Sequence, residues 1–241
     1  MTIGKFLTLA TVFVAAFTLG SCSKDDDEEE KTVVENNPKS VEHEYVDLGL
    51  PSGTLWATCN VGASKPEEYG DYFAWGEVKA KDKFDVSTYK WYNGSYKAIT
   101  KYCTDSEYGT VDNKTELLPE DDVATAYWGS SWCIPSSKQF TELIDPAYTT
   151  TAWTTQNGVN GLKITSKKNG KTLFLPAAGE RYPGQKTTYG NMGESCLYWS
   201  SSLHTDKPYW AYALFASDGY LELYDGVRLS GFAVRPVRTQ K

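Results

Sequence analysis

The chain has 241 residues, with 24 basic and 31 acidic side chains and a formal net charge of −7. This length is enough for one domain with a full hydrophobic core once a short leader is set aside. No basic stripe suits nucleic acid, so a nucleic-acid partner is excluded, and no residue pattern indicates a bound cofactor.

Residues 1–21 have the pattern of a secretory signal peptide. Lys5 is their only charge, and a nearly unbroken apolar run from Phe6 to Leu19 leads to small residues before a cysteine. That run is shorter than the roughly 20 apolar residues that a membrane-spanning helix needs. We therefore expect export and cleavage rather than a spanning segment.

The junction Leu19-Gly20-Ser21-Cys22 resembles the bacterial lipobox, whose cysteine receives lipid on its sulfur. The resemblance implies cleavage before Cys22 and a palmitate-type anchor at that residue. The following Ser23-Lys24-Asp25-Asp26-Asp27 is similar to the export tag of outer-membrane lipoproteins in Bacteroidetes-type bacteria. Several acyl chains, each contributing roughly 0.8 kcal/mol per buried methylene, give stable anchoring. We expect a lipid-anchored protein at the surface of the cell outer membrane.

Residues 22–44 are predicted to form an acidic, disordered tether, because blocks of like charge repel one another and remain solvated. From Tyr45 onward the chain has 20 basic and 22 acidic residues, a balance of −2. The negative charge therefore belongs mostly to the tether. Residues 45–241 are expected to be a single, nearly neutral domain.

Strands and two helices are expected along this domain. Residues 55–61 form a short apolar strand pattern. Pro119 opens a helix that runs to about Trp128, with acidic residues at the positive end of its dipole. Ser136 and Gln139 have the spacing of a capping box, which predicts a second helix that ends before Pro146.

Two hairpins and a final strand follow. Asn169-Gly170 predicts a type I′ turn, because this dipeptide readily adopts the positive φ angles that such a turn requires. Ser217-Asp218-Gly219 predicts the second turn, and Pro236 is expected to end the last strand. The strands expected here are residues 162–166, 172–175, 209–216, 220–224 and 232–235. The sum of these elements is an α+β fold.

Four cysteines remain after Cys22, namely Cys59, Cys103, Cys133 and Cys196. In an oxidising location they permit one or two disulfides, with three possible full pairings. Buried free thiols are the alternative, and Cys59 lies in the apolar strand pattern that suits this role. No C-x-x-C pair occurs, so no metal site is predicted.

Several ordered blocks carry a more specific resemblance. They are Tyr45 to Ala63, Tyr72 to Glu77, Trp132 to Ser136, Tyr198 to Ser202 and Gly231 to Val237. Together they resemble the Fibrobacter succinogenes major paralogous domain, which is related to C-type-lectin-like and sulfatase-modifying-factor-like folds.

This resemblance covers about residues 45–240. It implies helices flanking a twisted, mostly antiparallel sheet, with long irregular loops between Trp75 and Leu118 and between Thr149 and Gly161. The calcium-binding loop strings of sugar-binding lectins and the paired cysteines of the modifying enzymes are absent. Because this fold hosts binding modules and enzymes alike, the resemblance implies little about activity.

Catalytic chemistry has few candidates. His204 lies eight residues after Cys196 and close to Ser200–Ser202, but its position is more typical of a surface loop. Glu67-Glu68 is a carboxylate cluster, and the acids at 120–122 are explained by the positive helix end. No catalytic residue is predicted, and the chain is not expected to be an enzyme.

Aromatic residues are the remaining signal, at 31 of the 197 residues from Tyr45 onward. The tryptophans in strand or helix-entry patterns are expected in the core: Trp56, Trp75, Trp132 and Trp199. Trp91, Tyr92 and Trp153 lie in predicted loops, which makes them the candidate ligand contacts.

These features favour a non-catalytic binding or adhesion module for glycan or protein. The alternative is a structural subunit of a surface assembly, such as a pilus tip or a polysaccharide-uptake complex. A hydrolase is a third hypothesis.

Overall fold

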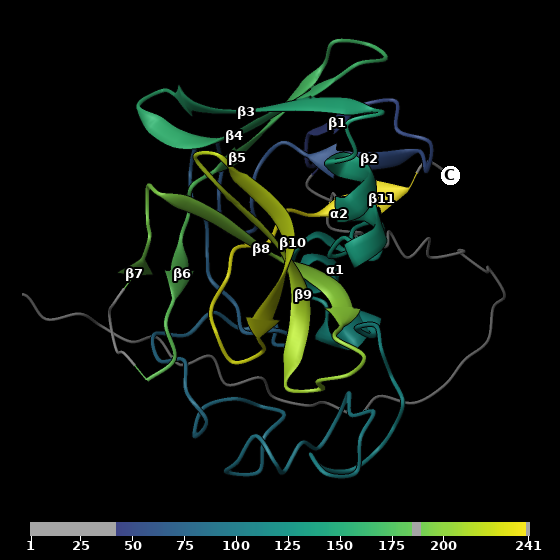
Figure 1. The fold of residues 1–241 in the computed structure, drawn as a ribbon, viewed down its shortest axis with the longest axis vertical. Coiled ribbons are helices and arrows are strands. Elements are labelled where there is room, and N and C mark those ends of the chain that lie inside the picture. Colours follow the sequence, from purple (N-terminus) through teal and green to yellow (C-terminus); the bar gives the residue numbers. More distant parts are fainter. Residues whose placement is uncertain (1–41, 185–188, 240–241) are drawn as a thin grey trace, which may run out of the picture. The chain divides into compact units, whose positions relative to one another are not determined.

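Antiparallel sheets and two short helices make up the part of the chain that the computed structural model describes, residues 42–184 and 189–239 (Figure 1). This agrees with the predicted mixture of strands and helices. All of these residues belong to a compact unit that begins at Lys39. The predicted signal peptide, Cys22 and most of the predicted tether lie outside the described residues.

The elements have the following bounds. The first strands are β1 Tyr45–Asp47, β2 Thr54–Ala57, β3 Thr149–Gln156, β4 Val159–Ser166 and β5 Thr172–Pro176. The later strands are β6 Glu180–Arg181, β7 Tyr189–Gly190, β8 Ser195–Leu203, β9 Trp210–Ser217, β10 Tyr220–Val227 and β11 Val237–Thr239. The helices are α1 Val123–Trp128 and α2 Ser137–Leu143, with a 3-10 turn, η1, at Pro119–Asp121.

The described strands form several small sheets rather than one continuous sheet. Three sheets have three strands each, in the orders β1-β2-β11, β10-β9-β8 and β3-β4-β5, and β6 pairs with β7. Every pair within these sheets is antiparallel. Within the described residues, none of the helices is long and apolar enough to cross a bilayer.

α2 begins where the sequence predicts, whereas Pro119 opens only the 3-10 turn η1 and α1 begins four residues later, at Val123. The Ser136 hydroxyl accepts a bond from the Gln139 N–H (3.3 Å), and the Gln139 side chain accepts one from the Ser136 N–H (2.8 Å), which completes a capping box. Phe140 and Leu143 then bury the apolar face of α2. At α1 the cap is Asp122, whose carboxylate accepts bonds from the N–H groups of Thr125 (3.0 Å) and Ile134 (2.8 Å).

The type I′ turn lies at a different Asn-Gly dipeptide from the one predicted. Asn157 and Gly158 both have positive φ, 50° and 84°, and form the two-residue turn between β3 and β4. At the predicted turn only Gly170 has positive φ, because the Ser166 hydroxyl accepts bonds from the next turn residues and favours a longer loop. The long irregular loop expected between Thr149 and Gly161 is therefore wrong.

The predicted strand at residues 232–235 is also wrong. Phe232 bridges Phe73 and Ala233 bridges Tyr198, so successive residues pair with different segments and no regular ladder forms. The regular strand is β11, which begins after Pro236 and pairs with β2. Proline thus precedes the strand here, where its missing N–H removes no ladder bond.

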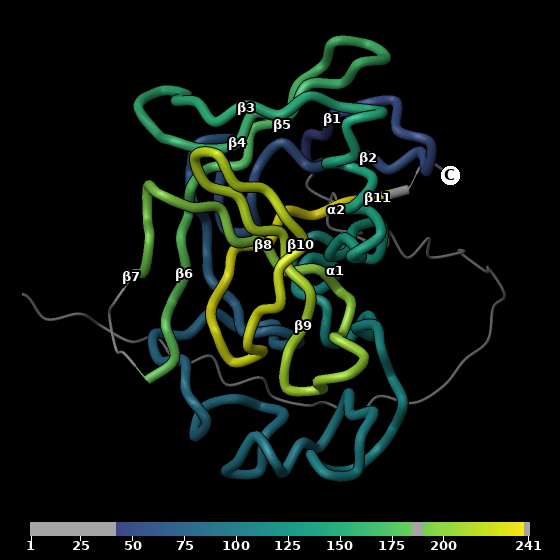
Figure 2. Tube along the Cα trace, in the orientation of Figure 1, coloured from purple at the N-terminus to yellow at the C-terminus, as the bar shows by residue number. Residues whose placement is uncertain are grey.

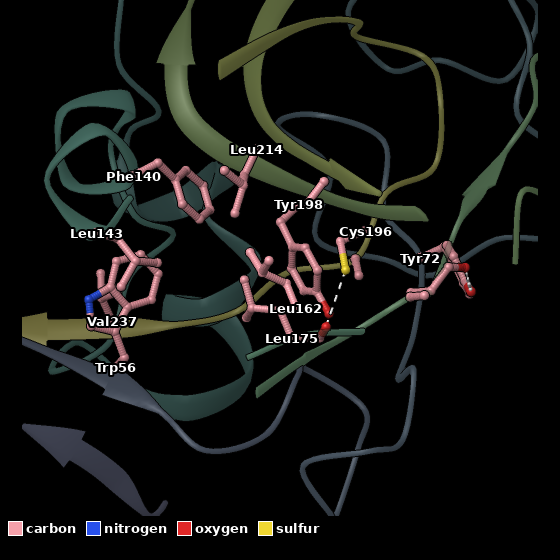
Figure 3. Close-up of a cluster of buried hydrophobic side chains, with 14 of the residues drawn as sticks. Trp56, Tyr72, Phe140, Leu143, Leu162, Leu175, Cys196, Tyr198, Leu214 and Val237 are labelled. Atoms are coloured by element: carbon pink, nitrogen blue, oxygen red, sulfur yellow. Dashed lines mark hydrogen bonds between the residues drawn. The ribbon is translucent and has the colours of Figure 1, made fainter. Parts of the chain in front are cut away.

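The four tryptophans predicted for the core are buried there, with exposed fractions of 0 to 4%. Figure 3 shows Trp56, Phe140 and Leu143 on one side of the drawn cluster and Tyr198 and Cys196 near its centre. The Cys196 thiol donates to the Leu175 carbonyl, and all four cysteines in the described residues are free. Cys59 is half-buried and lies beyond the end of β2, so its predicted place in a strand is wrong.

The predicted long loop between Trp75 and Leu118 is confirmed, since no helix or regular strand interrupts it. Its backbone folds back through short contacts, such as the Thr100 N–H bond to the Trp91 carbonyl (2.9 Å). Figure 2 shows this loop, in blue to teal, at the end of the domain opposite β3. It lies beside the turn between β8 and β9, to which Thr104 is bonded.

Candidate functional site

The structure does not bring the three predicted ligand contacts into one groove. Trp91 is half-buried, and its indole N–H donates to the Gly76 carbonyl (2.9 Å). Tyr92 is 7% exposed, and burial raises its pKa to about 12. Trp153 belongs to β3, at the other end of the domain from the long loop (Figure 1). Tyr92, a candidate ligand contact, therefore lies in the hydrophobic core rather than at the surface.

Trp153 lines a shallow cleft between β3 and the turn joining β9 to β10. The cleft measures about 360 Å³. Leu162 and Leu221 contribute apolar surface, and Tyr220 on the opposite wall is 73% exposed. Thr151, Ser217 and Asp218 supply the polar lining. Of the predicted contacts, Trp153 lies at this cleft.

A longer aromatic surface lies at the end of the domain that holds the long loop. We call it the aromatic strip, and its six members are Tyr96, Tyr108, His204, Tyr209, Trp210 and Tyr212. Each is half-buried or exposed, with Tyr96 at 48%. Two members come from the long loop, two from the residues between β8 and β9, and two from the start of β9.

The rings of the aromatic strip form a continuous chain of contacts. Tyr209 is central, with ring centroids 5.8 Å from Tyr96, 5.0 Å from Tyr108 and 5.6 Å from Trp210. His204 continues the chain, 6.0 Å from Trp210 and 5.2 Å from Tyr212, with which it is stacked. Because most neighbouring rings are tilted, their faces present different orientations to a ligand.

Arg228, buried beneath the aromatic strip, connects the long loop to the segment before β9. Its side chain is fully buried, yet no carboxylate pairs with it among the described residues. Instead, the guanidinium donates to the carbonyls of Tyr102 (3.0 Å), Lys101 (3.1 Å) and Pro208 (2.7 Å), and to the Tyr89 hydroxyl (2.9 Å). It therefore ties the long loop to the residue just before Tyr209.

Further bonds fix the backbone beneath the rings. The Tyr92 hydroxyl donates to the Tyr209 carbonyl (3.4 Å), so this predicted contact supports the aromatic strip from inside. The Thr104 hydroxyl donates to the Thr205 carbonyl (2.9 Å), and the His204 N–H donates to the Trp210 carbonyl (3.2 Å). The strip is thus held in place before any ligand arrives, which lowers the entropic cost of binding.

Apart from the His204 nitrogens, the polar atoms of the strip's rings are open. The tyrosine hydroxyls and the indole N–H of Trp210 have no hydrogen-bond partner among the described residues. Lys207 lies with its Nζ 4.2 Å from the Trp210 ring centroid, and Lys97 lies 5.9 Å from that of Tyr108. The surface therefore combines apolar ring faces with unsatisfied hydrogen-bonding groups.

His204 is hydrogen-bonded to backbone N–H groups and, among the described residues, not to a serine or cysteine that it could activate as a nucleophile. Its Nδ1 accepts bonds from the N–H groups of Asp206 and Lys207 (both 3.2 Å). The ring proton of the neutral form therefore resides on Nε2, which lies 3.5 Å from the Asp225 carboxylate. This arrangement fixes the plane of the imidazole against Tyr212.

The other sequence candidates for catalysis are engaged elsewhere. The Ser200 hydroxyl donates to the Tyr212 carbonyl (2.7 Å), and those of Ser201 and Ser202 donate to the Glu116 carboxylate. Asp121 is bonded to lysines and to the Tyr102 hydroxyl. Among the residues that the structure describes, no group of three metal-ligating side chains lies together.

Sequence reasoning missed the aromatic strip because residues 209–216 were predicted only as a hairpin strand, and the exposed face of that strand was not identified. The alternation in β9 contained the signal. Alanines 211 and 213 mark the buried face, so Trp210 and Tyr212 must point the other way. Nothing local marks Arg228 as buried, because three of its four partners lie more than 100 residues away in the sequence.

Searches with this chain found no matching family model, curated protein or solved structure.

Proposed function

We propose that this chain is a surface-anchored, non-catalytic glycan-binding lipoprotein whose ligand contacts the aromatic strip. The observation that carries the proposal is the continuous chain of six partly exposed rings, five of which have a polar atom without a partner among the described residues. The C–H face of a sugar ring packs on aromatic faces, while its hydroxyls need donors and acceptors of the kind that tyrosine and tryptophan supply.

The charge of the domain favours a neutral glycan over the other ligands of aromatic surfaces. Aromatic platforms that stack nucleic-acid bases are accompanied by a positively charged groove. Residues from Tyr45 onward carry a balance of only −2. Within the strip region, Lys97 is paired with Glu107 (2.9 Å), and Lys207 stands beside Asp206 in the sequence.

The test is a glycan array probed with the purified chain, followed by titration of a ligand against matched variants. Trp210→Ala removes the ring between Tyr209 and His204, and we expect affinity to fall about tenfold or more, as for other aromatic anchors. Trp128→Ala removes another half-buried tryptophan that lies outside the aromatic strip and should leave affinity unchanged. Equal loss in both variants, or no glycan bound, would refute the proposal.

The anchoring part of the proposal rests on Cys22, which lies outside the described residues. Its support is the apolar leader that ends at Leu19-Gly20-Ser21. Mass spectrometry of the mature amino terminus should find an acylated cysteine as the first residue. Protease treatment of whole cells should remove the domain if it faces outward, whereas an internal location would protect it.

We also propose that the fold is C-type-lectin-like. Support comes from the way the sequence blocks behind the family resemblance meet in space. Phe73 bridges Phe232, the Trp199 N–H donates to the Ala233 carbonyl (3.1 Å), and Cys133 bridges Val237. An experimental structure compared with known lectin-like domains would test this; a different chain topology would overturn it.

A further inference from the structure

β3 is an edge strand without the features that protect other edge strands. It is the outermost strand of the sheet β3-β4-β5, and its eight residues have the sequence TTTAWTTQ. They include no charge and no proline, and the register with β4 runs unbroken from Thr149 to Gln156. Long, regular and uncharged edges of this kind are templates for pairing with another strand.

Other sheet edges in the described part of the chain are protected. β1 has only three residues, and β5 ends in Pro176. β10 carries two acidic residues, Glu222 and Asp225. On the free side of β8, the Trp199 N–H donates to the Ala233 carbonyl and the Ser201 N–H donates to the Pro135 carbonyl (2.8 Å).

The hydrogen-bonding phase of β3 follows from its hairpin. Gln156 and Val159 flank a two-residue turn, so they exchange backbone bonds with each other. Three alternate residues, Thr151, Trp153 and Thr155, must then direct their backbone N–H and C=O groups to the free edge of β3. These groups form no hydrogen bond with any other segment among the described residues.

We propose that two copies of this chain associate by antiparallel pairing of β3 with β3, about a two-fold axis at Ala152. Outward-facing residues must pair with outward-facing residues, and this register places Thr151 opposite Trp153 of the second copy. It also pairs Thr150 with Thr154, a favourable cross-strand combination. The smallest side chain, Ala152, lies on the axis, where the two backbones are about 4.5 Å apart at their Cα atoms.

The cleft beside β3 favours a second copy of this chain as the partner that pairs with the free edge of β3. Residues opposite each other in an antiparallel pair project from the same face of the sheet. Trp153 of the second copy therefore projects beside Thr151, which lines the cleft together with Leu162 and Tyr220. Pairing would cover the exposed ring of Tyr220 with an indole, and the two-fold axis repeats this contact in the second copy.

This dimer goes beyond glycan binding by a single domain. β3 and the aromatic strip lie at opposite ends of the domain in Figure 1, so pairing through β3 leaves both strips accessible. Two strips on one particle would raise the avidity for a repeating glycan without adding any contact to a sugar.

The first test is sedimentation of the purified full chain, with Ala152→Lys and a control. The unaltered chain should form a concentration-dependent dimer. Ala152→Lys places two positive charges on the axis and should give a monomer with an unchanged circular dichroism spectrum. Thr172→Lys puts lysine on β5, the other outer strand of this sheet, and should remain dimeric. An unaltered chain that is monomeric at every concentration, or a dimer that survives Ala152→Lys, would overturn the proposal.

The second test fixes the register and does not depend on Ala152→Lys remaining folded. A cysteine at position 152 would lie opposite the same cysteine of the second copy, at a Cα separation that a disulfide accepts. Ala152→Cys should therefore give a covalent dimer under mild oxidation, whereas Thr172→Cys and the unaltered chain should not. Absence of the Ala152→Cys cross-link in a chain that sediments as a dimer would exclude this register.

Discussion

The buried aromatics of the core and the aromatic strip use the same residue types in opposite ways. In the core, the polar atom of a ring usually ends on the backbone. The indole N–H of Trp75 donates to the Ser200 carbonyl (2.8 Å), that of Trp199 to the Phe73 carbonyl (2.7 Å), and the Tyr198 hydroxyl to the Pro176 carbonyl (2.9 Å). In the aromatic strip, the tyrosine hydroxyls and the Trp210 indole N–H have no such partner among the described residues.

This difference separates structural from ligand-binding aromatics better than position in a loop does. Trp91 and Tyr92 lie in a loop, yet both have their polar atoms bonded to backbone carbonyls and act as supports. Trp210 begins β9 and Tyr209 directly precedes it, yet the Tyr209 hydroxyl and the Trp210 indole N–H have no partner among the described residues. A buried polar atom without a partner costs free energy, which favours a place near solvent or a ligand for rings that leave one open. Trp56 is an exception, because its buried indole N–H has no partner among the described residues.

The largest effect on stability is expected at Arg228, the buried residue that connects the core to the aromatic strip. Arg228→Met keeps the aliphatic length but leaves three carbonyls and the Tyr89 hydroxyl without their donor. Unfolding free energy should fall by about 3 to 5 kcal/mol, as when one partner of a buried charged network is removed. Chemical denaturation measures it, with half-buried Arg238→Met as the control. A loss below about 1 kcal/mol would show that Arg228 does not hold the loop.

A smaller, pH-dependent effect is expected at Asp121, which bonds the Tyr102 hydroxyl (2.7 Å) and the ammonium groups of Lys101 (2.6 Å) and Lys90 (3.0 Å). Burial by itself would raise the pKa of Asp121, but these three donors hold it below its ordinary value. The carboxylate therefore stabilises the fold above the ordinary carboxyl pKa, and this contribution disappears as pH falls through the lowered value.

The variant that tests this is Asp121→Asn. It should cost about 2 kcal/mol near neutral pH, a typical value for hydrogen bonds to a charged group. The difference from the unaltered chain should shrink on acidification, when both side chains are neutral. Denaturation midpoints across the acidic range would show it. A difference independent of pH would mean that the ion pairs contribute little.

Local signals predicted the helices better than the turns. The capping box at Ser136 is a short-range arrangement, so sequence spacing was enough to place α2. The Asn-Gly dipeptides were ambiguous, because the choice between them depends on Ser166, whose hydroxyl also donates to the Leu48 carbonyl 118 residues away (2.6 Å). Tertiary contacts of this kind are invisible in a local pattern.

The candidate site was predictable in part. The long loop was expected, and it contributes Tyr96 and Tyr108 to the aromatic strip. The particular rings could not be chosen, because exposure depends on which aromatic side chains find backbone carbonyls after folding. Arg228 makes this clear: it is buried by bonds to residues more than 100 positions away, apart from Pro208.

Removal of one oxygen atom from the core gives the next effect in size. Tyr198→Phe leaves the ring in place but removes a hydroxyl that donates to the Pro176 carbonyl and accepts from the Asn60 side chain (3.2 Å). Unfolding free energy should decrease by about 1 kcal/mol, the usual value for a buried hydrogen bond. Glycan affinity should not change. An unchanged unfolding free energy would mean that hydrogen bonds from the polar atoms of core aromatics do not stabilise the fold.

The same change in the aromatic strip should have the smallest effect on stability and a different effect on function. Tyr212→Phe removes a hydroxyl with no partner among the described residues, so unfolding free energy should change by less than about 0.5 kcal/mol. If a sugar hydroxyl bonds to it, affinity should fall several-fold, since about 1 kcal/mol corresponds to a factor of five. Calorimetric titration alongside Tyr198→Phe completes the comparison. If Tyr212→Phe lowered stability without lowering affinity, Tyr212 would be a structural ring like the buried aromatics of the core. The aromatic strip would then end at His204.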